Sequence, residues 1–205
     1  MPSLPAKAFH FVDQANWAAV QAQGLRSTDE LLRRSAFGAE VDAAVRGHRA
    51  QGVTLPDGCY VRDQRPMPPQ ALARCLDAGL VPADWYALLN GCVFFWLDPD
   101  RVARHRAALS NRPQVLLTFD ARALATAYEA AAHVTPFNTG SAMRKAAPRG
   151  LRTLVPLAQW QAQGWASEAL PQQPVRAASH RPAELVFRAA VPDAMRFVTA
   201  TEAIG

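Results

Sequence analysis

The sequence has little of what binds metals or forms disulfides. Its three cysteines, Cys59, Cys75 and Cys92, are far apart and form no C-x-x-C pair. An odd number of widely spaced cysteines argues against a disulfide framework and against a zinc site. We therefore expect three reduced, mostly buried thiols and no bound metal.

Long apolar runs are missing as well. The longest, such as residues 93–97, are too short to cross a bilayer. The first residues, MPSLPAKAFH, lack the basic stretch and apolar core of a signal peptide. With 205 residues, of which 50% are hydrophobic and 19% charged, the chain fits one folded domain over 1–205 and is not globally disordered. We expect a cytoplasmic protein with no membrane partner.

Acidic residues are scarce in the middle of the chain. Between Arg101 and Arg152 the only acids are Asp120 and Glu129, which leaves a charge of +7 in a chain of formal net charge +5. The basic residues there are Arg101, Arg104, Arg106, Arg112, Arg122, Arg144, Lys145, Arg149 and Arg152. Such a stretch can hold phosphates or a nucleic-acid backbone, or it can be a solvated arginine-rich surface. Charge alone favours neither.

Common nucleotide-binding motifs are also missing: the chain has neither G-x-G-x-x-G nor a Walker A motif, and no regular βαβ alternation. Patterning predicts strands at 8–12, 92–97, 114–119, 153–155, 184–187 and 195–198. It predicts helices at 13–24, 39–50, 69–78, 82–90, 98–109 and 156–163. Residues 128–134 fit either element. With helices early and strands late, the pattern indicates an α+β fold.

Two of the four places suited to chemistry lie in the first half of the chain. His10 is on the first predicted strand, where a lone histidine is more often structural than functional. The segment from Phe94 through Phe95 and Trp96 to Arg101 joins a predicted strand to a helix. Alternation sends Phe95 to the opposite face from its two neighbours. Three consecutive aromatics are typical of a core strand, but one face could stack on a planar ring while Arg101 reaches a phosphate.

The other two places lie in the second half. A polar loop contains Asn138, Thr139, Gly140 and Ser141, whose small side chains would let backbone N–H groups approach an anion. A plain surface loop is an equal alternative. Glu184 opens a predicted strand after a proline. Taken alone, such a carboxylate fits a solvated sheet edge better than a general base held in a cleft.

Together these places resemble a known family. The segments are FHFVDQANWAAVQAQGL at the start, VFFWLDPDR in the middle and RPAELVFRAAVP near the end. In order and spacing they resemble the DarT-type branch of the ADP-ribosyltransferase superfamily, and are similar to uncharacterised bacterial relatives of that branch. The matching positions are His10, Asn16, Trp17, Val20, Gly24, Leu25, Phe94 to Arg101, Ala183, Glu184, Val191 and Pro192. The middle motif has Pro-Asp-Arg where the family has Pro-Arg, so Arg104 is an alternative to Arg101.

The resemblance implies an ADP-ribosyltransferase-like split β-sheet core, with a helical insert at about 26–89. It implies transfer of ADP-ribose from NAD⁺ with release of nicotinamide, and needs no metal. In these terms Glu184 would stabilise the sugar cation and Arg101 would hold the pyrophosphate or steady that carboxylate. His10 would hydrogen-bond the adenosine ribose, and Phe94, Phe95 or Trp96 would pack on the nicotinamide. The loop of Asn138, Thr139, Gly140 and Ser141 would cover the dinucleotide or receive the acceptor.

Three hypotheses follow. The first is an NAD⁺-dependent ADP-ribosyltransferase whose acceptor is a nucleic acid or a protein, with an inhibitory partner protein as a further expectation. The second is an enzyme of the same fold that removes an RNA 2′-phosphate, which would need no catalytic glutamate. The third is a catalytically degenerate binding module. Nicotinamide release, and its dependence on Glu184, would separate them.

Overall fold

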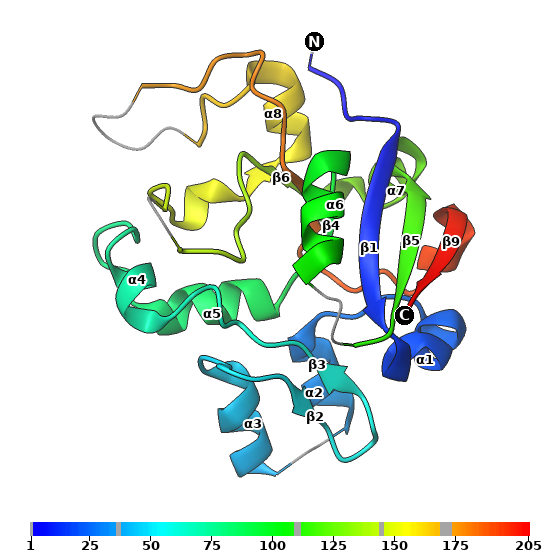
Figure 1. The fold of residues 1–205 in the computed structure, drawn as a ribbon. Coiled ribbons are helices and arrows are strands. Elements are labelled where there is room, and N and C mark those ends of the chain that lie inside the picture. Colours follow the sequence, from blue (N-terminus) through cyan, green and yellow to red (C-terminus); the bar gives the residue numbers. More distant parts are fainter. Residues whose placement is uncertain (1, 36–37, 109–111, 144–145, 169–173) are drawn as a thin grey trace.

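A mixed sheet-and-helix architecture is seen in the computed structural model, which describes residues 2–35, 38–108, 112–143, 146–168 and 174–205. Seven antiparallel strands form one sheet in the order β7-β6-β8-β4-β1-β5-β9 (Figure 1). Their bounds are Val155–Pro156, Ala132–Thr135, Glu184–Phe187, Val93–Trp96, Lys7–Asp13, Gln114–Asp120 and Val198–Ile204. A separate hairpin pairs β2 (Val53–Thr54) with β3 (Tyr60–Val61). The α+β expectation is confirmed.

Helices cover both faces of the sheet. The helices of the described chain are α1 (Trp17–Gln23), α2 (Thr28–Ser35), α3 (Ala39–Arg46), α4 (Pro69–Ala73), α5 (Pro82–Asn90), α6 (Pro99–Ala108), α7 (Ala121–Ala127) and α8 (Leu157–Gln163). One face packs on α7 and α8 through Phe95, Leu117, Phe119, Leu124, Trp160 and Phe187. On the other, α5 packs on Val186 of β8 through Trp85, Tyr86 and Leu89, and α6 lies in front of β4 (Figure 1).

The sheet nearly separates between its two central strands. β1 pairs with β5 along its whole length, from Lys7–Asp120 to Asp13–Gln114. Among the described residues, β1 pairs with β4 at Phe9 and Trp96 alone. Beyond that point the two strands diverge. A side chain or a ligand can therefore enter between them without breaking further ladder hydrogen bonds.

Several predicted elements need correction. The strand predicted at 195–198 is a 3₁₀ turn, Ala194–Phe197, and the strand β9 begins where that turn ends. The ambiguous residues 128–134 divide into a 3₁₀ turn, Glu129–Ala131, and β6. Helix α7 and the β2–β3 hairpin were not predicted. Alanine-rich α7 begins at Asp120, whose side chain accepts from the backbone N–H groups of Arg122 and Ala123.

The segment from Arg26 to Leu89 combines helices with the hairpin. Helices α2 and α3 and the hairpin share a small core of Leu32, Val45, Leu55 and Val61. Asn16, in the 3₁₀ turn after β1, ties this unit to the sheet. Its side chain donates to Tyr60 O at 2.8 Å and accepts from Tyr60 N at 2.7 Å. The Asn16 amide thus bonds the Tyr60 backbone as a neighbouring strand would. These bonds hold the β2–β3 hairpin beside the gap between β1 and β4.

Candidate functional site

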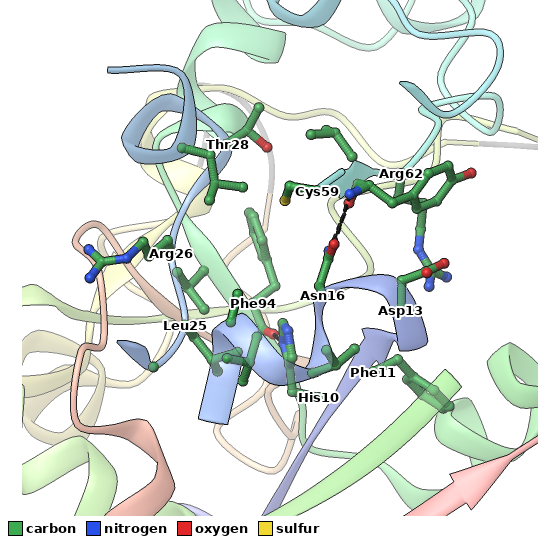
Figure 2. Close-up of a pocket in the computed structure, with 18 of the residues that line it drawn as sticks. His10, Phe11, Asp13, Asn16, Leu25, Arg26, Thr28, Cys59, Arg62 and Phe94 are labelled. Carbon is green, nitrogen blue, oxygen red and sulfur yellow. Dashed lines mark hydrogen bonds between the residues drawn. The ribbon is translucent and has the colours of Figure 1, made fainter. Parts of the chain in front are cut away.

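Two adjoining pockets lie where β1 and β4 diverge. The first, about 350 Å³, is lined by His10 and Asn16 (Figure 2). The second, about 410 Å³, is lined by Trp96 and Glu184. Both are lined by Thr28, Val61, Arg62, Cys92 and Phe94. Because five residues line both, the two pockets adjoin each other, and together they are called the cleft. Their volumes are in the range typical of small-molecule sites.

His10 bridges the gap between the two central strands. Its Nδ1 lies 2.7 Å from Phe94 O. A carbonyl can only accept, so Nδ1 carries the proton and Nε2 is left as an acceptor. Burial lowers the pKa of His10 to about 4, with the charge of Arg62 adding to the shift and the Phe94 hydrogen bond opposing it. The neutral imidazole in the first pocket can accept a hydrogen bond from a ligand hydroxyl.

A second buried histidine predicts that stability depends on pH. Burial, with Arg62 and His10 as further causes, lowers the pKa of His105 to about 4. Between about pH 6.5 and pH 4 the unfolded chain therefore binds more protons than the folded one, and acidification favours unfolding. We expect the free energy of unfolding to fall by up to about 1.4 kcal/mol per pH unit for each histidine.

Urea unfolding at pH 7.5, 6 and 5 measures this slope. In the comparison variant, His10→Asn retains a donor for Phe94 O and His105→Gln an acceptor for Arg62. We expect this double variant to show a shallower pH dependence. An equal slope in both proteins would contradict the assignment of two neutral buried imidazoles.

The aromatic strand β4 divides its side chains between core and cleft. Phe95 is 1% exposed and meets Phe119 and Phe187 edge to face at 5.0 and 5.5 Å. Phe94 and Trp96 are half-buried on the other face, where both line the second pocket. Trp96 also packs on His105, with ring centroids 5.4 Å apart. All three expected stacking residues line the second pocket, but the ring of Phe95 is nearly all buried in the core and lies 5.4 Å from that of His10, so Phe94 and Trp96 offer the more exposed ring faces.

Glu184 lies inside the sheet and not at its edge. β8 runs between β6 and β4, and Glu184 pairs with Thr135 and Trp96. It is 4% exposed. Its Oε2 accepts from Thr135 Oγ1 at 2.8 Å, Thr139 Oγ1 at 2.9 Å and Thr139 N at 3.2 Å. The solvated-edge expectation is wrong, because pattern alone did not show that β8 has a neighbour on each side.

The electrostatics of Glu184 follow from this burial. Burial raises the pKa of the Glu184 carboxyl above its ordinary value, and the three hydrogen bonds and the charge of Arg101 oppose that rise. All described hydrogen bonds go to Oε2. Oε1 is therefore the oxygen left for a ligand. A preorganised carboxylate of this kind suits the stabilisation of a developing positive charge.

Arg62 lines the cleft and Arg101 does not, although the charge of Arg101 still acts on Glu184. Arg101 is in the first turn of α6, its Nε lies 3.3 Å from Asp98 Oδ2, and it lines a different pocket with Lys7 and Arg181. The alternative, Arg104, is exposed on α6, and neither pocket of the cleft is lined by it. Arg62 lines both pockets. Arg101 lies outside the cleft because the first turn of α6 projects its side chain toward the N-terminal end of β1.

Arg62 is held by neutral partners. Its Nη2 donates to Gln114 Oε1 at 2.6 Å, and its Nη1 lies 3.5 Å from His105 Nε2. Within the part of the chain that the structure describes, no carboxylate forms an ion pair with it, although the charges of Asp13 and Asp63 attract it; Asp13 pairs with Arg112, Oδ2 to Nε, at 2.7 Å. Burial lowers the pKa of Arg62. A half-buried guanidinium without an ion-paired carboxylate favours an anionic ligand.

The predicted polar loop is only partly in the cleft. Asn138, Thr139 and Gly140 line the second pocket, whereas Ser141 is not among its lining residues. Asn138 Oδ1 accepts from Gly140 N at 2.9 Å, which folds the turn on itself. Thr139 is 1% exposed and is held on Glu184. The loop therefore positions the acid as well as forming a wall.

The basic stretch does not act as one charged patch. Arg101, Arg106 and Arg112 pair with Asp98, Glu202 and Asp13, and Arg149 is buried. Arg144 and Lys145 lie outside the described residues. Sequence reasoning missed Arg62 and the buried polar residues Arg49, Gln64 and Asn90, which line the second pocket. The only sequence feature that could have indicated Arg62 and Gln64 is the Arg- and Gln-containing run 61–69. This run reads as a loop, because the strand before it, β3, has only two residues.

Comparisons with known proteins give the family alone. No described helix is long and apolar enough to span a membrane, and in the described chain no group of three or more His, Cys, Asp or Glu side chains is arranged to hold a metal. No curated protein and no solved structure matches the chain. A family model described as a family of unknown function, DUF7002, matches residues 6–198. Because this match covers most of the sequence, the chain belongs to the DUF7002 family.

Proposed function

We propose that the cleft binds NAD⁺ and that the protein transfers ADP-ribose from it with release of nicotinamide. One observation carries this proposal. His10 on β1, Phe94 and Trp96 on β4, and Glu184 on β8 come from distant parts of the sequence, yet they line two adjoining pockets on three neighbouring strands, with Phe94 in both. These are the residues for which the family resemblance implies substrate contacts.

The lining chemistry suits the parts of a dinucleotide. The neutral His10 offers an acceptor to a ribose hydroxyl at one end. Phe94 and Trp96 offer apolar ring faces near Glu184 at the other. Arg62 lies at the wall common to both pockets, where a pyrophosphate linking two nucleosides would pass. This order matches adenosine, pyrophosphate and nicotinamide riboside.

The chemistry follows from the position of the acid. Breaking the bond between ribose C1′ and the nicotinamide nitrogen leaves the electron pair on nicotinamide and cationic character on the sugar. Ionised Glu184, in a site of low dielectric, stabilises that cation. It can then take the proton of the acceptor as the acceptor bonds to C1′. Because burial raises the pKa of Glu184, the rate should increase with pH until the carboxyl is ionised.

Calorimetry with NAD⁺ and chromatography of released nicotinamide test the proposal. We expect binding with one site per chain and release that increases when an acceptor is supplied. Labelled NAD⁺ offered to DNA, RNA and protein identifies the acceptor. No binding of NAD⁺ would overturn the proposal, and binding without release from any mixture would favour a binding module.

Two matched arginine variants test which cation contacts the substrate. Arg62→Gln removes a charge-assisted contact, and we expect the Kd for NAD⁺ to rise about 10- to 100-fold. Arg101→Gln removes a charge at the start of α6, outside the cleft, and should change the Kd less than about twofold. The reverse order of effects would return the role to Arg101 and contradict the placement of the pyrophosphate.

A further inference from the structure

Arg149 is a buried cation that the proposed chemistry leaves without a role. It is 1% exposed. No described carboxylate lies within ion-pair distance of its guanidinium, although Glu184 contributes an attractive charge interaction. Burial lowers the pKa of Arg149. Because burying an unpaired charge costs free energy, its position calls for a physical reason.

The surroundings hold this guanidinium in one orientation. Arg149 Nε donates to Ala147 O at 3.2 Å. The guanidinium carbon lies 5.0 Å from the ring centroid of Phe137 and 5.8 Å from that of Trp85. The Arg149 backbone is also fixed, since its N–H donates to Cys75 O at 2.8 Å and its O accepts from Asp77 N at 2.9 Å. The side chain is thus anchored from the α4–α5 side.

The Arg149 guanidinium reaches from this fixed backbone to Thr139, in the turn that hydrogen-bonds Glu184. Arg149 Nη1 donates to Thr139 O at 3.1 Å. Thr139 in turn donates its N–H and its hydroxyl to Glu184 Oε2. Arg149, Thr139 and Glu184 therefore form a continuous chain that starts on a fixed backbone and ends at the carboxylate.

We propose that Arg149 is a positioning residue for the reaction: it holds Thr139 against Glu184 and offsets the burial of the carboxylate charge. This inference rests on the proposed function. Arg149 does not line the cleft and needs no contact with substrate. Besides Arg149, Arg101 and Cys92 interact electrostatically with Glu184. The other charged or titratable groups that line the second pocket with Glu184 are His105, Arg49, Arg62, Asp63 and Arg65.

Three variants test this role. Arg149→Gln removes the charge, and Arg149→Lys keeps it while losing the planar fork of donors. Arg176→Gln is the matched control. Arg176 also lies over Phe137, at 5.6 Å, but it pairs with Glu168 at 3.0 Å and has no hydrogen bond to Thr139. All are measured for kcat and KM of nicotinamide release between pH 5.5 and 9.

We expect Arg149→Gln to lower kcat at pH 7 about tenfold, with KM for NAD⁺ changed less than about twofold. The loss should shrink as pH rises, because a carboxyl without its nearby cation ionises at higher pH. Arg149→Lys should keep the pH profile and lose about threefold in kcat. Arg176→Gln should change neither. A pH-independent loss in Arg149→Gln, or an equal effect in Arg176→Gln, would overturn the proposal.

A measurement without turnover separates this inference from the proposed function. The Glu184 carboxyl is titrated by carbon NMR in wild type and variants, with Glu184→Gln assigning the resonance. A Glu184 titration moved to higher pH in Arg149→Gln supports the coupling even if NAD⁺ is not the substrate. An unmoved titration overturns it even if NAD⁺ is cleaved. Should Arg149→Gln fail to fold, Arg149→Lys still decides: an unchanged kcat would overturn the positioning role.

Discussion

Glutamine at position 184 is expected to reduce nicotinamide release by at least about 10²-fold, while leaving the fold and NAD⁺ binding in place. The amide oxygen of glutamine can still accept from Thr135 and Thr139 in the position of Oε2. The amide nitrogen then replaces Oε1. The negative charge and one acceptor are lost, and with them the stabilisation of the sugar cation and the base for the acceptor proton.

A matched carboxylate gives the control. Glu168 is also buried, but it pairs with Arg176 and does not line either pocket of the cleft. Glu168→Gln should lower the melting temperature and leave kcat at 20 °C within about twofold. Calorimetry verifies that Glu184→Gln still binds NAD⁺. Release that survives in Glu184→Gln would exclude the proposed role of the acid, and would favour a phosphate-removing enzyme that needs no glutamate.

The strands that form the cleft could be predicted from the sequence, and their neighbours could not. Alternation and β-branched residues identify β1, β4, β5 and β8 within one or two residues. The sheet order depends on long-range pairing, which leaves no local signal in a single sequence. For this reason the position of Glu184 at an edge was predicted wrongly. The resemblance, unlike the pattern, did imply that His10 and Glu184 share a site.

Side-chain direction explains the arginine assignment. The start of α6 at Asp98 and Pro99 was predicted correctly from its cap. The direction in which Arg101 projects depends on how α6 packs on β4. That packing is tertiary structure, so the sequence pattern does not predict it. Arg62 follows a two-residue strand, too short for periodicity to show, and it reaches the cleft because Asn16 holds Tyr60 over the gap. Hydrophobic periodicity does not detect elements this short, because side-chain contacts fix them and no repeating pattern marks them.

The fold also explains how the buried acid Glu184 and the half-buried cation Arg62 can share one cleft. Arg62 is held by Gln114 and His105 on the β5 and α6 side, whereas Glu184 is held by Thr135 and Thr139 on the β6 side. Each charge has neutral partners, and neither forms an ion pair with the other. A ligand with an anionic group would pair with Arg62, and a cationic centre that develops on the same ligand would be stabilised by Glu184. NAD⁺ during loss of nicotinamide has this distribution of charge.

The second large effect is expected on stability, from alanine substitutions at the adjacent residues Phe94 and Phe95 of β4. Phe95→Ala should lower the free energy of unfolding by about 3–5 kcal/mol, because it removes a ring packed between Phe119 and Phe187 and leaves a cavity. Phe94→Ala, on the half-buried face, should cost less, about 1–2 kcal/mol. Urea unfolding with a constant m-value measures both.

The same pair separates stability from binding, since alternation places the two rings on opposite faces. Phe94→Ala should weaken NAD⁺ binding about tenfold, because an aromatic wall of the cleft is lost. Phe95→Ala, assayed at a temperature where it is folded, should bind NAD⁺ within about threefold of wild type, because its ring lines the second pocket but is 1% exposed and is packed mainly in the core. If instead Phe95→Ala lost binding at full stability, the sheet face assigned to the ligand would be the wrong one.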